Sequence, residues 1–188
     1  SPGGEDLVQA ESWRTIADAL VDGFDPTTLL YEQFAGFYEL EPLLIAEHAE
    51  PPVAADVLLG SERVAASQII KQPDVLMLHH LIPEAVAPRS LHANLAFYGP
   101  RTAHGSSLSP AVQAALLARA GRPDDALPMF QIACRLDLDD LTGTAAGGLH
   151  LATMGGVWQA LTFGFLGLRP TKRGLLLAPK HPSTWQAR

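Results

Sequence analysis

Cysteine and charged side chains are both scarce in this 188-residue sequence. The single cysteine, Cys134, excludes an intrachain disulfide, so a reducing compartment such as the cytoplasm is the expected location. Only 18% of the residues are charged, and 13 basic against 20 acidic side chains give a net charge of −7. A surface that binds nucleic acid is therefore not expected. Because 47% of the residues are hydrophobic, the composition predicts a globular domain rather than a disordered chain.

Long apolar runs and a leader-like start are also missing. No stretch is apolar over the roughly 20 residues that a membrane-spanning helix needs. The first residues, Ser-Pro-Gly-Gly-Glu, contain no basic segment followed by an apolar one, so a signal peptide is not expected. They also lack an initiator methionine, which favours a domain or a processed fragment of a longer protein.

Helical periodicity is what the sequence contains in quantity. Apolar residues recur at helical spacing over residues 6–22, 61–70, 74–82, 90–98, 109–120, 122–136 and 149–166, and weakly over 43–59. Segment 74–82 is apolar nearly all round, which predicts burial on most of its faces. Residues 24–41 are expected to form an ordered loop with a short strand or turn, and 175–178 one short strand. The pattern predicts an all-α chain of helical pairs.

One loop, residues 98–109, combines a histidine, a glycine and three serines in its second half without any carboxylate. Ser109 and Pro110 are expected to be the N-cap and the first-turn proline of the next helix. Exposed N–H groups, serine hydroxyls and a helix N-terminus suit an oxyanion such as phosphate. The alternative is that these serines only cap a helix and turn the chain.

Two further loops precede apolar helices. Lys71 lies beside a helix N-terminus, where the helix dipole disfavours a cation, so a binding role is one interpretation and a solvated side chain is the other. The second loop, residues 137–148, carries three aspartates without the spacing of a calcium loop, and these are expected to cap or turn the chain. If alternate helices line one barrel, all three loops gather at one end of it.

Three glycines lie inside the last predicted helix, residues 149–166. Each costs about 1 kcal/mol of helix stability relative to alanine. Gly155, Gly156 and Gly164 therefore predict close helix packing or a backbone that faces a ligand.

Six segments carry a resemblance to a known family. They are Gln-Phe-Ala-Gly-Phe at 33–37, Ile-Lys-Gln-Pro-Asp-Val at 70–75, Leu-Ala-Phe-Tyr at 95–98, His-Gly-Ser-Ser-Leu-Ser at 104–109, Gly-Leu-His-Leu-Ala at 148–152 and Met-Gly-Gly-Val-Trp at 154–158. In this order they resemble glycoside hydrolase family 65, the maltose, trehalose and kojibiose phosphorylases. The resemblance covers roughly residues 13–179, and the last three segments are its most specific part.

The resemblance implies a fold and an activity. The fold is an (α/α)6 barrel, a toroid of antiparallel helical hairpins, of which residues 1–174 would supply the second half. Residues 175–188 would be the start of a C-terminal β segment or a tail. The activity is that of an inverting α-glucoside phosphorylase, which releases β-glucose 1-phosphate and whose general-acid glutamate would lie upstream of this chain. This chain alone is then expected to be inactive.

The resemblance also implies roles for particular residues. It assigns the bound glucose to Lys71 and Gln72, and the phosphate pocket to His104, Gly105, Ser106, Ser107 and His150. No cofactor or metal is expected, because inorganic phosphate is itself a substrate.

Two other functions stay open at this point. A hydrolase of the same fold needs a carboxylate base about 6.5–9.5 Å from the acid, and the local candidates are Asp137, Asp139 and Asp140. A non-catalytic half-barrel that acts as an interaction module is the third interpretation. The expected partners are an α-linked glucose disaccharide and phosphate, with no nucleic acid and no membrane. Because an incomplete barrel exposes apolar helix faces, a complementary fragment or a second copy of the chain is also expected.

Overall fold

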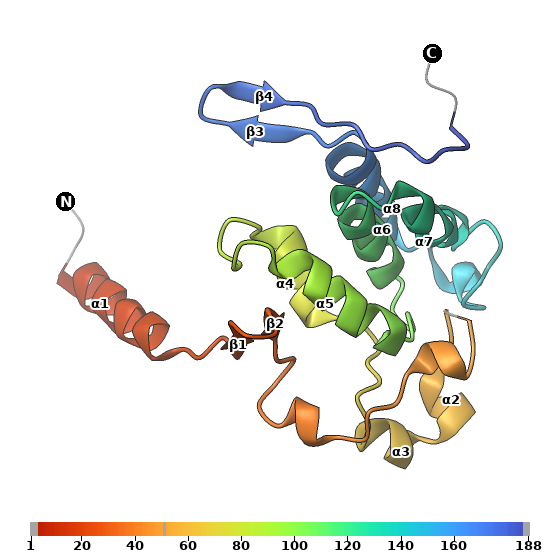
Figure 1. The fold of residues 1–188 in the computed structure, drawn as a ribbon, viewed down its shortest axis with the longest axis horizontal. Helices are drawn as coiled ribbons and strands as arrows, with labels where there is room; N and C mark the ends of the chain where they lie inside the picture. Colours follow the sequence, from red (N-terminus) through yellow and green to blue (C-terminus); the bar gives the residue numbers. More distant parts are fainter. Residues whose placement is uncertain (1–3, 51, 186–188) are drawn as a thin grey trace.

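The computed structural model describes residues 4–50 and 52–185, and most of this chain is helical (Figure 1). The α-helices are α1 (Gly4–Ala19), α2 (Ala55–Leu59), α3 (Ser61–Ala65), α4 (Asp74–Leu81), α5 (Ser90–Tyr98), α6 (Ser109–Arg119), α7 (Pro123–Arg135) and α8 (Leu151–Gln159). Short 3-10 turns cover Phe37–Glu39, Ile45–Glu47, Gly99–Arg101 and Ala145–Gly147, and α8 continues as a π-helix, η5 (Ala160–Phe165). The helical content confirms the prediction from periodicity.

The strands form two small antiparallel hairpins. β1 (Phe24–Asp25) pairs with β2 (Leu30–Tyr31), and β3 (Arg169–Thr171) pairs with β4 (Gly174–Leu176). The first hairpin lies in the segment expected to be a loop with a short strand. The strand expected at 175–178 is the second arm of a hairpin that starts earlier, at Arg169.

Helix α6 is the centre of the packing. Nine of its eleven residues are buried, and it contacts α4, α5, α7, α8 and η5. Gly121, with a φ of 78°, ends the turn after α6, and Pro123 then begins α7 beside it. The first turn of α6 follows the serine-rich loop directly, so this loop ends at a helix that is buried along most of its length.

The last helical segment packs closely on α6 through glycine. A Cβ at Gly164 would lie 2.8 Å from the Cα of Ala115, and one at Gly156 would lie 3.0 Å from the Cβ of Ala111. A Cβ at Gly155 would meet nothing within 4 Å among the described residues. Close packing is therefore confirmed for two of the three helical glycines.

Gly164→Ala should destabilise the protein by about 1–3 kcal/mol, because the new methyl group would press on the α6 backbone, which cannot rotate away. Gly155→Ala is the matched control: it adds the same methyl group in open space and should be neutral or stabilising by up to ~1 kcal/mol. Chemical denaturation of both variants measures the difference. Equal stability of the two variants would contradict this description of the interface.

The first hairpin is fixed to α5 by buried polar contacts. The side chain of Asn94 accepts a hydrogen bond from the Tyr31 backbone N–H and donates one to the Leu29 carbonyl. The Tyr98 hydroxyl donates to the Tyr31 carbonyl at 2.5 Å. Asn94 and Tyr98 are both fully buried. These bonds explain how so short a hairpin keeps its place.

Two local predictions were wrong, and a third holds with shifted ends and a change of helix type. The helix expected over 61–70 ends at Ala65, and residues 67–70 are buried and extended instead. Helix α4 is not buried on most faces, since Leu81 is 65% exposed and only Val75, Leu76 and His79 are buried. The helix expected over 149–166 begins at Leu151 and changes to a π-helix at Ala160. Helical periodicity does not contain the long-range contacts that determine where a helix ends and which of its faces are covered.

Apolar side chains also stay exposed on α1 and α8. Helix α1 extends away from the rest of the chain (Figure 1), and its Trp13 is 62% exposed. On α8, Leu151 and Trp158 are 73% and 60% exposed. None of the described helices is both long and apolar enough to cross a membrane. The expectation of no signal peptide rests on residues 1–5, of which the first three lie outside the described residues.

Candidate functional site

The candidate site is built by loops that pair with one another as extended chain. The Ile70 N–H donates to the Arg101 carbonyl at 3.0 Å, and the Ala103 N–H donates to the Ile70 carbonyl at 2.8 Å. On the other side, the Val53 N–H donates to the Ala103 carbonyl at 2.9 Å. This pairing brings Lys71 beside the serine-rich loop, although the two are more than 30 positions apart in the sequence.

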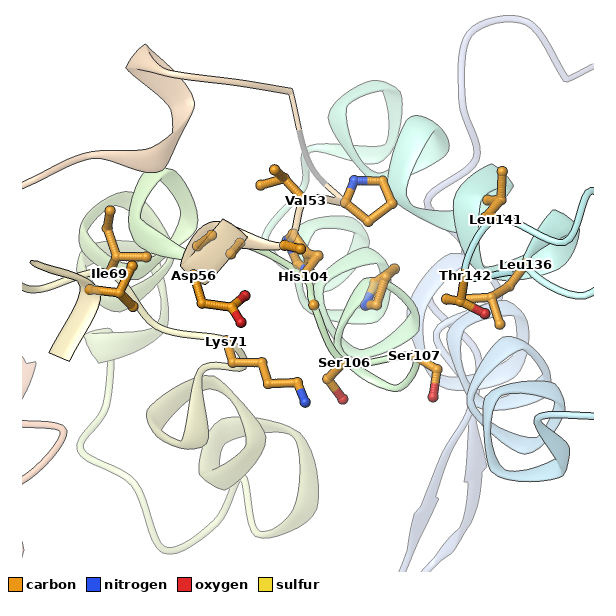
Figure 2. A pocket seen from close by; sticks show the side chains of 17 residues that line it. Val53, Asp56, Ile69, Lys71, His104, Ser106, Ser107, Leu136, Leu141 and Thr142 are labelled. Atoms are coloured by element: carbon orange, nitrogen blue, oxygen red, sulfur yellow. The ribbon is translucent and has the colours of Figure 1, made fainter. Parts of the chain in front are cut away.

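A pocket of about 510 Å³ opens where these segments meet (Figure 2). Its polar wall includes five of the seven residues singled out in the sequence, which are Lys71, His104, Gly105, Ser106 and Ser107. Its apolar wall consists of residues 52–55, 64, 69, 103, 110, 136 and 141. Figure 2 shows Lys71 extending along the pocket towards Ser106. The side chain of Lys71 is therefore exposed, and it faces this pocket.

Gly105 lies directly beside the side chain of Lys71. A Cβ at Gly105 would lie 3.4 Å from Cγ of Lys71 and 3.5 Å from the Val53 carbonyl oxygen. These are ordinary van der Waals distances, so the lysine stem lies directly against the backbone at position 105. The lysine stem and the loop backbone therefore form one continuous part of the pocket wall.

A hydrogen-bond chain holds the inner side of the loop. The Ser109 hydroxyl donates to the Ser106 carbonyl at 3.1 Å and lies 2.9 Å from Nδ1 of His104. Because a hydroxyl has one proton, Nδ1 of His104 is the donor in the second contact. The N-cap of α6 is Leu108, and no side chain caps the helix. The prediction that Ser109 caps this helix was therefore wrong, because its hydroxyl is used inside the loop.

His104 is a neutral group at physiological pH. Its ring is almost wholly buried, and this burial lowers its pKa from the ordinary value of 6.5 to about 4. Its backbone has a φ of 53°, which is uncommon for any residue other than glycine. His104 can therefore shape the pocket and offer a dipole, but it brings no positive charge to it.

The depressed pKa of His104 predicts a pH-dependent stability. Below pH 6.5, His104 binds a proton more readily in the unfolded chain than in the folded one. The contribution of neutral His104 to the free energy of unfolding is therefore complete above pH 6.5 and is lost as the pH falls towards 4. At about 1.4 kcal/mol per pH unit, the loss between pH 7 and pH 5 should be about 2 kcal/mol larger in the wild type than in His104→Asn. Asparagine tolerates the positive φ, and exposed His48→Gln is the control for removing a histidine. Urea unfolding at both pH values gives the result, and equal losses in wild type and His104→Asn would show that His104 titrates normally.

His150 and Gln72 lie outside the wall of this pocket. The ring Nδ1 of His150 is 2.5 Å from one carboxylate oxygen of Asp137, and its backbone N–H donates to the other at 2.8 Å. The side-chain hydrogen bond from His150 lowers the pKa of Asp137. Gln72 is exposed and follows Lys71 directly. The binding roles expected for His150 and Gln72 therefore stay predictions.

The sequence analysis missed one carboxylate of this region and did not predict the contact that a second one makes. Asp56, in the first turn of α2, lines the same pocket as Lys71 (Figure 2). Its segment is only weakly helical in sequence and contains no motif, so nothing there indicated a site. Asp137 was expected to cap or turn the chain, and it does accept a hydrogen bond from the His150 backbone N–H. Its second hydrogen bond, to the ring of His150, was not predicted.

The other two aspartates of this loop have structural partners. Asp139 forms an ion pair with Arg135 at 2.5 Å, and Asp140 accepts the Ala145 N–H at 2.9 Å. Across the part of the chain that the structure describes, no group of three histidine, cysteine or carboxylate side chains could hold a metal ion.

Comparisons with known proteins bear on the chain as a whole. The model of the "Glycosyl hydrolase family 65 central catalytic domain" matches residues 5–159. A kojibiose phosphorylase of Caldanaerobacter subterraneus subsp. tengcongensis is 33% identical over 184 residues, which are 95% of this chain and 23% of that protein. An alpha,alpha-trehalose phosphorylase of Geobacillus stearothermophilus is 34% identical, over 93% of this chain and 23% of that protein. A maltose phosphorylase of Bacillus subtilis is 32% identical, over 95% of this chain and 24% of that protein.

A solved structure agrees with these relatives. A human-microbiome protein provisionally assigned as a kojibiose phosphorylase superposes with a TM-score of 0.82 at 32% identity, over 97% of this chain and 25% of that one. The chain thus spans about a quarter of the length of the relatives that it matches. The length of the match to the family model, together with these identities, shows that the chain belongs to glycosyl hydrolase family 65, within its central catalytic domain.

Proposed function

We propose that this chain is part of an inverting α-glucoside phosphorylase, which cleaves a glucose disaccharide with inorganic phosphate and releases β-glucose 1-phosphate. The observation that carries the proposal is that Lys71 and the loop of Gly105, Ser106 and Ser107 line the same pocket. Relatives that are named for three different disaccharides, kojibiose, trehalose and maltose, are all phosphorylases, which supports the same reaction class here.

The serine-rich loop is the proposed phosphate site. Among residues 4–50 and 52–185, the Ser107 hydroxyl makes no hydrogen bond, and the Ser106 hydroxyl accepts only a long one of 3.4 Å from the Leu108 N–H. Both hydroxyls are therefore free to donate to an anion. Lys71 adds a positive charge to the same pocket, and Asp56 offsets part of it. Hydroxyl donors near one cation suit a phosphate oxygen better than they suit a water nucleophile, which needs a base.

The reaction would proceed by one displacement at the anomeric carbon. A phosphate oxygen forms a new bond to the anomeric carbon. The bond between this carbon and the glycosidic oxygen breaks on the opposite face. A glutamic acid, expected in a part of the longer protein that this chain does not contain, gives its proton to the leaving oxygen. Phosphate thus takes the place that base-activated water has in an inverting hydrolase. We assign Lys71 and Gln72 to the glucose, and His150 with residues 104–107 to the phosphate.

The exposed apolar faces suit a barrel completed by other helices. Leu151 and Trp158 on α8 and Trp13 on α1 are each more than half exposed, and large exposed apolar faces are typical of surfaces that another part of a protein covers. We propose that the chain supplies the second half of an (α/α)6 barrel. A complementary part of the protein or a second copy would then cover these faces.

Product analysis tests the proposal. The full-length protein is incubated with kojibiose, trehalose or maltose, with and without inorganic phosphate. β-Glucose 1-phosphate should form only when phosphate is present, and its anomeric configuration can be read by NMR. Free glucose alone, formed equally without phosphate, would assign the chain to a hydrolase. No cleavage of any α-glucoside would favour the non-catalytic half-barrel.

A further inference from the structure

The two serine carbonyls of the candidate phosphate loop are both bound by buried hydroxyls. The Ser109 hydroxyl donates to the Ser106 carbonyl at 3.1 Å, and the Thr153 hydroxyl donates to the Ser107 carbonyl at 3.0 Å. Ser109 is 3% exposed and Thr153 is 2% exposed. A backbone carbonyl carries partial negative charge, so one that turned into the pocket would repel an anion. Both carbonyls are instead engaged with the interior of the protein.

Thr153 lies in a helix that packs closely on α6. It lies in the first turn of α8, which packs on α6 where a Cβ at Gly156 would come within 3.0 Å of Ala111. The residue before this helix, His150, is fixed by two hydrogen bonds to Asp137. The Thr153 hydroxyl reaches a loop 46 residues away in the sequence. It is a contact between α8 and the loop, and the sequence motifs give no sign of it.

We propose that Thr153 is a positioning residue for the phosphate loop. Its hydroxyl keeps the peptide after Ser107 oriented with the carbonyl inward, so the loop presents hydroxyl donors and no acceptor from this peptide to the pocket. Thr153 does not itself touch the anion. The inference rests on the proposed function, since it concerns how the same site holds phosphate.

The test compares Thr153→Val with Thr153→Ser in the full-length protein. Valine keeps the shape of threonine and removes the hydroxyl, whereas serine keeps the hydroxyl and removes a methyl group. Thr162→Val, a buried hydroxyl in the π-helix that follows α8, is the control for losing a hydroxyl elsewhere in this segment. The readouts are the KM for phosphate, the KM for disaccharide, kcat and the melting temperature, together with calorimetric binding of inorganic phosphate. Thr153→Ala replaces the valine variant if valine prevents folding.

Thr153→Val should weaken phosphate binding about threefold to tenfold, the effect of one lost neutral hydrogen bond. The disaccharide KM and the kcat at saturating phosphate should stay within about twofold of the wild type, because the change acts on the loop alone. Thr153→Ser should bind phosphate like the wild type. A valine variant with wild-type phosphate affinity would overturn the inference, as would equal losses in the Thr162→Val control or in Thr153→Ser. A wild-type protein that neither binds nor uses phosphate would instead overturn the proposed function.

Discussion

Replacing Ser106 and Ser107 together by alanine should raise the KM for phosphate by about one order of magnitude if one hydroxyl binds it, and by about two to four if both do. A hydrogen bond to a charged group contributes about 1.5–3 kcal/mol, and about 1.4 kcal/mol corresponds to one decade in affinity. Folding should change little, because Ser109 keeps its bonds to His104 and to the Ser106 backbone carbonyl. Phosphate saturation kinetics in the full-length protein measure the effect.

The controls for this result lie in the same chain. Ser61→Ala changes an exposed serine at the start of α3, away from the pocket, and should leave the phosphate KM unchanged. The melting temperature of the double variant should stay near that of the wild type. If the double variant keeps a wild-type dependence on phosphate, the loop is only a turn before α6 and the hydrolase interpretation gains support.

Lys71→Met should act mainly on the sugar, lowering kcat/KM for the disaccharide by about one to two orders of magnitude. The loss is that of a charge-assisted hydrogen bond to a glucose hydroxyl, about 1.5–3 kcal/mol. The phosphate KM should rise only about twofold to fivefold, because an exposed ammonium attracts an anion through water with at most ~1 kcal/mol.

Methionine keeps the stem that packs beside Gly105, so the loop should hold its shape. The control is Lys172→Met, which removes an exposed lysine at the β3–β4 turn. Steady-state kinetics with each substrate varied in turn separate the two constants. A Lys71 variant that loses phosphate affinity while its disaccharide KM is unchanged would reverse the two assignments.

Local sequence signals predicted the helices well and the contacts between loops poorly. Proline and glycine marked the turn between α6 and α7, and the apolar spacing marked both helices. The meeting of Lys71 with Gly105 depends on the pairing of Ile70 with Arg101 and Ala103, which is a long-range contact that no local pattern contains. The pocket could therefore be expected only from the family resemblance and the order of the loops.

The errors have a common physical origin. Ser109 precedes a proline in a pattern that usually means a helix cap, but its hydroxyl finds partners in His104 and the Ser106 carbonyl. Residues 67–70 have helical spacing, yet they are buried as chain that bridges to Glu41 and Thr102. Asp56 belongs to a five-residue helix without a motif and reaches the pocket only through the fold. Tertiary contacts decided each case against the local preference.

The most direct measurement is a crystal structure of the full-length protein with inorganic phosphate bound. Phosphate oxygens should lie within about 3.2 Å of the hydroxyl oxygens of Ser106 and Ser107, with the Ser107 carbonyl still bound by Thr153. The Lys71 side chain should remain along Gly105 in the same pocket. Phosphate bound elsewhere, with both serine hydroxyls turned away from it, would contradict the assignment of this loop.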